Sequence, residues 1–196
     1  MTPTEAPNGL LELLHTRRSV KPACMAEPGP TAAQLDAILS IAARVPDHKK
    51  LVPWRFIVFE GAARAAFGAV LAEACVAEEA TPPSPVRLDL ERGRFTRAPL
   101  VIGVVSRISE VKGAPQWEQE LSCGAACMNL CLAANALGFG TSWLTEWYSY
   151  SPMVVARLAL AANERLAGFV YVGTAVERQE DRERPALGQI VTRWQG

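Results

Sequence analysis

Two adjacent arginines and a serine are the first residues whose types could do chemistry. Arg17, Arg18 and Ser19 follow the leucine-rich stretch 10–14. A guanidinium presents a rigid fork of donors that matches phosphate oxygens, and a serine hydroxyl adds another donor. Solvated charge at a helix end is the alternative, because a cation there also suits the helix dipole. By themselves these residues are compatible with both an anion site and an ordinary surface.

A second polar cluster lies between two prolines, in the segment "PDHKKLVP" at 46–53. The prolines stiffen the segment, which separates a helical pattern from a strand-like one. It contains His48, one of only two histidines in the chain. A lone loop histidine is most often a plain polar residue. Polar loops beside strands are nevertheless common places for binding sites.

A glycine-containing turn precedes Thr141, Ser142 and Trp143. Its glycines, Gly138 and Gly140, follow a helical pattern and open a strand. In the dinucleotide fingerprint glycines follow a strand and open a helix, so this turn is not a Rossmann phosphate loop. Neither GxGxxG nor GxxxxGK[ST] occurs in the sequence. The three residues after the turn could still offer backbone amides and an aromatic wall to a flat ligand.

Two further groups of side chains resemble sites but are better explained structurally. Three cysteines share one face of a predicted helix: Cys123, Cys127 and Cys131. A structural zinc site needs four ligands, so we interpret them as small buried thiols and expect no metal. No spacing ties three scattered carboxylates into an acid–base set: Glu118, Glu120 and Glu146. We therefore expect no catalytic side chain supplied by the protein.

The surrounding pattern predicts the elements that position these residues. Helices are expected at 9–16, 62–80 and 115–138, from Thr31 to before Pro46, and from Ser151 onward; strands are expected at 55–60, 99–106, 140–145 and 168–174. The 115–138 helix is small or apolar nearly all round, which favours burial. Residues 81–95 are expected to form a proline-rich loop with a short helix. The apolar 99–106 strand should lie at the centre of a mixed sheet with helices on its faces.

Length and composition indicate a globular protein of one domain. The 196 residues fit one domain spanning 1–196, and 20 basic residues balance 20 acidic ones. Such a balance excludes a global field that would attract nucleic acid or a membrane surface. The first residues lack a secretory pattern, and no apolar stretch approaches the roughly 20 residues of a membrane span. With five cysteines, an odd number, we expect a cytoplasmic protein with free thiols.

Three motifs in a fixed order carry a resemblance to a known family. "HTRRSVKP" near the start, "RVPDHKKLVPWRF" before the first strand, and "LGFGTSW" after the long helix resemble the nitroreductase family. More narrowly, they resemble its compact subgroup with a "PDHK…PW" loop. The resemblance covers roughly residues 10–175.

That resemblance implies an α+β fold of the nitroreductase type, in a homodimer that binds FMN at the subunit interface. It implies ping-pong hydride transfer from NAD(P)H, through FMN, to nitroaromatic, quinone or similar small acceptors. Carried over by position, it assigns eight cofactor contacts: Arg17, Arg18, Ser19, Arg44, His48, Thr141, Ser142 and Trp143. The tail arginines Arg182 and Arg184 match the family's C-terminal basic pair too loosely for an assignment.

Three other functions stay open at this point. One is a flavin-binding protein without turnover, which stores or senses FMN. Another is a cofactor-free interaction domain in which the arginines are surface charge. The third is another chemistry of the same fold, such as dehalogenation or flavin fragmentation, which typically needs an extra lid motif. The acceptor, the nicotinamide preference, the division of contacts between Arg17 and Arg18, and the role of 81–95 also stay open.

Overall fold

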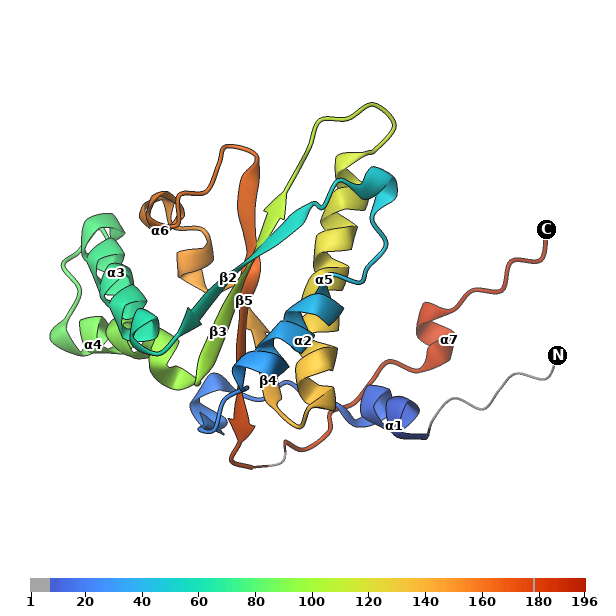
Figure 1. Cartoon of the computed structure of the whole chain (residues 1–196), viewed down its shortest axis with the longest axis horizontal. Helices are drawn as coiled ribbons and strands as arrows, with labels where there is room; N and C mark the ends of the chain where they lie inside the picture. Colours follow the sequence, from blue (N-terminus) through green and yellow to red (C-terminus); the bar gives the residue numbers. More distant parts are fainter. Residues whose placement is uncertain (1–7, 178) are drawn as a thin grey trace.

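A five-stranded sheet lies at the centre of the computed structural model, which describes residues 8–177 and 179–196 (Figure 1). The strands are β1 (Met25–Ala26), β2 (Trp54–Glu60), β3 (Leu100–Arg107), β4 (Gly140–Leu144) and β5 (Glu164–Ala175). Their order is β1-β5-β3-β2, and β4 also pairs with β5. These strand pairs are antiparallel, and a parallel bridge joins Ser19 to Thr141. Among the described residues, this bridge is therefore the parallel part of a sheet that was predicted to be mixed. Strand directions could not be predicted, because the order of strands along a sequence does not fix them.

Helices cover both faces of the sheet. On one side lie α2 (Ala32–Ala42) and α5 (Gln116–Ala136); on the other lie α3 (Ala62–Glu78), α4 (Pro85–Gly93) and α6 (Pro152–Arg157) (Figure 1). Helix α1 (Asn8–Thr16) contacts α5, and α7 (Leu187–Ile190) lies in the tail. Short 3-10 turns complete the chain: η1 (Pro22–Cys24), η2 (His48–Lys50), η3 (Arg94–Arg97) and η4 (Trp147–Ser149).

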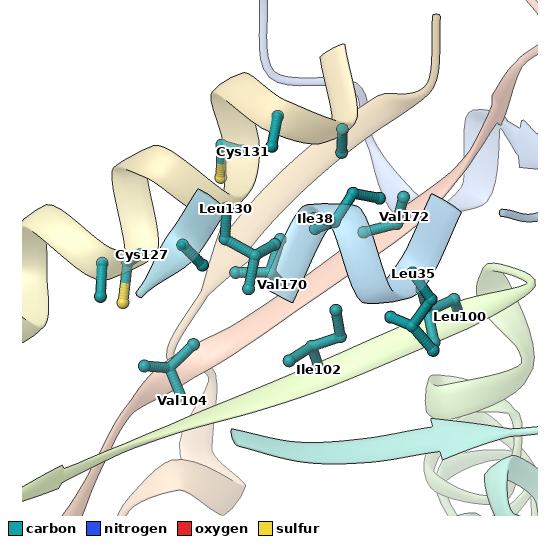
Figure 2. Close-up of a cluster of buried hydrophobic side chains, with 14 of the residues drawn as sticks. Leu35, Ile38, Leu100, Ile102, Val104, Cys127, Leu130, Cys131, Val170 and Val172 are labelled. Carbon is teal, nitrogen blue, oxygen red and sulfur yellow. The ribbon is translucent and has the colours of Figure 1, made fainter. Parts of the chain in front are cut away.

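Alternate residues of β3 contribute to two separate halves of the core. Leu100, Ile102 and Val104 pack against α2 and α5 (Figure 2). Val101 and Val105 face the opposite way, into a cluster that includes Phe59, Phe67 and Phe95 of β2, α3 and η3. Each of these β3 residues is at most 3% exposed. The prediction of a central strand covered on both faces is confirmed.

Local capping signals set the helix ends as predicted. The Thr31 hydroxyl accepts from the Gln34 backbone N–H at 3.3 Å, and the Gln34 side chain accepts from the Thr31 N–H at 2.9 Å, a complete capping box. Ser151 caps α6. Gly138, just beyond α5, has φ +90, which glycine adopts without strain.

The segment predicted as a loop with a short helix, 81–95, is mostly helical. It contains α4 and the start of η3. Helix α4 packs closely on α3, because a Cβ on Gly68 would lie only 2.0 Å from the Arg92 carbonyl oxygen.

Helix α5 corrects the prediction of a helix buried all round. One face packs on the sheet, whereas Trp117 is 66% exposed, Leu121 54% and Met128 37%. Gly124 lies on the same face, and a Cβ there would meet no atom within 4 Å. The sheet covers only the side of the helix that faces it, so an apolar stripe stays exposed in a single chain. We call these four residues the α5 stripe.

A two-pronged ion pair links Arg55 of β2 to Glu164 of β5, with distances of 2.7 and 2.8 Å. Hydrogen bonding from Arg55 lowers the pKa of Glu164 from the ordinary 4.5 to about 2, although burial acts in the opposite direction. The folded state therefore binds fewer protons than the unfolded state within that interval. We expect the free energy of unfolding to fall as the pH drops from about 4.5 to 2.

Urea unfolding at several pH values measures this dependence. In Glu164→Gln the decline between pH 4.5 and 2 should be shallower than in the parent chain, because the titrating carboxyl is gone. Equal declines in both proteins would contradict the assignment.

Candidate functional site

A cavity of about 360 Å³ lies where α1, the end of α5 and the start of β4 meet. We call it the arginine cavity. Its walls come from segments far apart in the sequence: Leu13, Thr16, Arg17, Arg18, Val20, Asn135, Gly138, Phe139, Gly140, Ala175, Glu177 and Gln179.

Arg17 is positioned in this cavity by Asn135. The Arg17 Nε donates to Asn135 Oδ1 at 3.4 Å, and Asn135 Nδ2 donates to the Phe139 carbonyl at 2.8 Å and to Thr141 Oγ1 at 3.2 Å. One amide thus connects α5, the glycine turn and β4 to the arginine. Within the described residues, neither Nη atom of Arg17 has a hydrogen-bond partner. The guanidinium fork therefore has donors available for an anion.

Arg18 is held differently, by the C-terminal tail. Its Nε donates to the Glu180 carbonyl at 2.8 Å and lies 3.8 Å from the Asp181 carboxylate. Arg184 Nη2 lies 3.3 Å from the same Asp181 oxygen, so this carboxylate sits between two guanidinium groups. The two adjacent arginines therefore have separate surroundings.

Ser19 and Val20, which follow Arg17, contact β4 mainly through their backbone groups. Ser19 forms the parallel bridge to Thr141, and the Val20 N–H donates to the Thr141 carbonyl at 2.9 Å. The side chains of Thr141 and Ser142 are buried. The structure thus brings Arg17, Ser19 and Thr141 together.

Trp143 is the exposed aromatic residue of β4, at 41%. Its Nε1 donates to the Ala167 carbonyl at 3.0 Å, which fixes the indole against β5. A Cβ on Gly168 would lie 2.5 Å from that nitrogen, and Gly168 has φ +139. Glycine at 168 is therefore required for the indole to lie there.

His48 lies at the other end of α5, beside a second cavity of about 420 Å³. We call this cavity the His48 pocket; it is lined by Pro46, His48, Glu118, Leu121, Ser122 and Ala125. The His48 Nδ1 lies 2.6 Å from Glu118 Oε2. Ser122 fixes the start of the loop, since its hydroxyl donates to the Pro46 carbonyl at 2.7 Å.

Arg44 is an exposed residue just beyond the end of α2, in the segment that leads to His48. Its carbonyl accepts from Asn129 Nδ2 at 3.0 Å, which ties the α2 terminus to α5. A helix rises about 1.5 Å per residue, so Ser122 and Asn135 lie about 20 Å apart. In one chain the structure therefore does not bring His48 to Arg17.

Two residues that contact the predicted site residues were missed from the sequence. Asn135 gave no signal except its polar type in the last turn of an apolar helix. Glu118 was considered as a carboxylate, but no spacing linked it to His48, 70 positions away.

The thiols near the arginine cavity are poor nucleophiles. Burial raises the pKa of Cys131, although the Thr141 hydrogen bond and the Arg17 charge act in the opposite direction. The hydrogen bond that Cys127 donates to Cys123 raises the pKa of Cys127. All five cysteines are free. In residues 8–177 and 179–196, no three His, Cys, Asp or Glu side chains gather as metal ligands would.

No helix among the described residues is both long and apolar enough to cross a bilayer.

Comparison with known proteins places these features in a family. The model of the nitroreductase family matches residues 14–174. "Putative NAD(P)H nitroreductase YdjA" of Escherichia coli K12 is 41% identical over 164 residues, which cover 84% of this chain and 87% of the relative. A Haemophilus influenzae protein named "Putative NAD(P)H nitroreductase" is 34% identical over 171 residues, covering 87% and 90%.

Solved structures share the fold. The nitroreductase-like family protein of Bacillus cereus has a TM-score of 0.81 at 20% identity, covering 98% of this chain and 100% of its own. A "putative nitroreductase in complex with fmn" from Desulfovibrio desulfuricans has a TM-score of 0.72 at 22% identity, covering 96% and 98%. The family match across 14–174 and the 41% identity over most of both chains show that this protein belongs to the nitroreductase family.

Proposed function

We propose that the protein is an FMN-dependent oxidoreductase that uses NAD(P)H to reduce small electrophilic acceptors such as nitroaromatics or quinones. The observation that carries the proposal is Arg17, which lines a cavity of about 360 Å³ and whose Nη donors have no partner among the described residues, in a member of this family. The names of the bacterial relatives support the nicotinamide and the acceptor class. The free thiols support a reducing compartment, the cytoplasm.

The residues around Arg17 fit the phosphate end of FMN. A phosphate monoester carries about 1.5 to 2 negative charges near neutral pH, and a protein of zero formal net charge must match them locally. A guanidinium pairs with phosphate through two parallel hydrogen bonds. The Arg18 Nε already donates to the tail, so we assign the phosphate to Arg17 and place Arg18 at the edge of the site.

The other predicted residues would orient the cofactor. The exposed indole of Trp143 offers an aromatic surface to a flat ring, and the bridge between Ser19 and Thr141 joins the segment of Arg17 to β4. Bound FMN would supply the hydride-accepting and hydride-donating chemistry, in a ping-pong cycle. The chain's own part is to bind the phosphate and to exclude water from the ring.

A complete site requires a second copy of the chain. Arg17 and His48 lie near opposite ends of α5, and the α5 stripe begins at the His48 end. In a twofold dimer whose α5 helices pack antiparallel, the stripes cover each other. We propose that His48 and Arg44 of the second copy complete the site that Arg17 begins. The eight predicted contacts are then shared between two subunits at each site.

The α5 stripe provides a test of this arrangement. We expect Leu121→Glu to give a monomer, because the dimer would bury an unpaired carboxylate of each subunit in the interface. FMN binding should weaken at least about tenfold, since the partner's contacts are lost. Sedimentation velocity and flavin fluorescence titration measure the two effects.

The control is Val86→Glu on α4, where the parent side chain is 79% exposed on the other side of the sheet. A Leu121→Glu protein that stays dimeric would contradict the interface.

The activity itself is tested on the purified protein with FMN. Anaerobic NADH or NADPH should bleach the flavin absorbance, and a nitroaromatic or quinone should restore it. A flavin that binds and never bleaches would favour storage or sensing. A chain that takes up no FMN at all would favour a cofactor-free interaction domain.

A further inference from the structure

The His48–Glu118 pair joins the loop after α2 to the first turn of α5. Both side chains are about half exposed, at 51% and 48%, and both line the His48 pocket. A carboxylate near neutral pH only accepts hydrogen bonds, so the imidazole Nδ1 must be the donor across the 2.6 Å contact. That contact decides which ring nitrogen carries the proton.

We infer that Glu118 is a positioning residue for the cofactor site: it holds His48 in the Nδ1–H form and leaves Nε2 to accept a hydrogen bond from FMN. In the neutral ring Nε2 is an acceptor, which suits the donor groups of FMN, its ribityl hydroxyls and its ring N–H. This inference rests on the proposed function, because it takes His48 to be a cofactor contact.

The loop that carries His48 is held in place on several sides. The Asp47 carboxylate accepts from the Leu51 and Val52 backbone N–H groups at 3.0 and 2.9 Å. The Lys49 ammonium donates to the Lys112 carbonyl. Ser122 holds the Pro46 carbonyl at the start of the loop. These contacts fix the backbone from which the imidazole extends.

The same loop contains three non-glycine residues in the left-handed region: Lys49 at φ 62, Lys50 at φ 54 and Val52 at φ 49. A β-branched residue at positive φ is a genuine outlier. Strain of this kind persists only where surrounding contacts over-determine it, and such sites are often functional. The loop thus fixes the position of His48, and Glu118 fixes its ring orientation and tautomer.

The tautomer is read directly by long-range ¹H–¹⁵N spectra recorded at pH 8.5. The chain has only two histidines, so His15→Gln assigns the signals. The parent protein should show the Nδ1–H pattern for His48. Glu118→Ala should lose this pattern, whereas Glu118→Gln should keep it, because an amide oxygen still accepts from Nδ1.

FMN affinity links the tautomer to the cofactor. Glu118→Ala should raise the Kd for FMN about 2- to 12-fold, the range for loss of one neutral hydrogen bond. In a His48→Ala background the same change should have no further effect, as expected for two residues that act as a unit. The matched control is Glu120→Ala, two positions along α5, whose carboxylate pairs with Arg165 and Gln116 instead.

Three results would overturn the inference: an Nε2–H tautomer in the parent protein, a pattern unchanged by Glu118→Ala, or an affinity loss that persists in the His48→Ala background. A parent chain that binds no FMN would instead defeat the proposed function. The spectra need no FMN, so the two failures are distinguishable.

Discussion

Replacing Arg17 by alanine is expected to weaken FMN binding by about 1.5–3 kcal/mol, or roughly 10- to 150-fold in Kd. The reason is the loss of a charged hydrogen-bond donor from the arginine cavity, where Asn135 holds the guanidinium in place. Titration of FMN fluorescence with apoprotein measures the change. Arg17→Lys should give an intermediate Kd, since it keeps the charge and loses the fork.

The matched control for this prediction is Arg157→Ala. Arg157 lies on α6, on the other side of the sheet, and its guanidinium pairs with Glu73 at the surface. The same change at Arg18 also removes the contact to Glu180 and is the less specific test. Equal Kd values for the Arg17→Ala and Arg157→Ala proteins would refute the phosphate assignment.

The largest effect on stability is expected at Glu91 of α4, which is fully buried. Its carboxylate accepts from Arg94 Nη2 at 2.9 Å and from Trp147 Nε1 at 3.0 Å, and it lies 3.0 Å from Arg87 Nε. Removing one member of a buried ion pair leaves uncompensated charge, which typically costs 3–5 kcal/mol. We expect Glu91→Ala to lower the free energy of unfolding by about that amount.

Denaturant unfolding followed by circular dichroism measures this loss, at one protein concentration for all variants. Glu73→Ala is the control, because it removes the carboxylate of an ion pair whose side chains are about half exposed. Such pairs contribute about 0–1 kcal/mol. If Glu91→Ala were no more destabilising than Glu73→Ala, the buried network would not hold α4 in place.

The helices could be predicted from the sequence because their signals are local. Thr31 and Gln34 form the capping box within four residues, and Ser151 caps its helix through Val154. Strand β1 was missed, since two residues show no periodicity and pair only through the distant end of β5. The burial of Glu91 was equally hidden, because a glutamate is seldom buried unless partners from other segments pair with it.

Some features of the candidate site could likewise be predicted from the sequence, and others could not. The cofactor contacts of Arg17 and His48 came from the family resemblance and not from residue type alone, and those assignments stay predictions. Their spatial separation could not be predicted from spacing, because it depends on which end of α5 each loop reaches. Asn135 had no detectable signal, since its three partners come together only in the folded chain.

The strand that holds the sheet together is the last strand of the sheet to be synthesised. β5 pairs with β1, β3 and β4, and it ends at Ala175. Translation delivers the N-terminal segments first, at about 5–20 residues per second. Until β5 leaves the ribosome, β3 has a partner on one side only, and β1 and β4 lack their partner strand altogether. The nascent chain therefore carries open strand edges until β5 emerges, and the native sheet forms only after β5 has been translated.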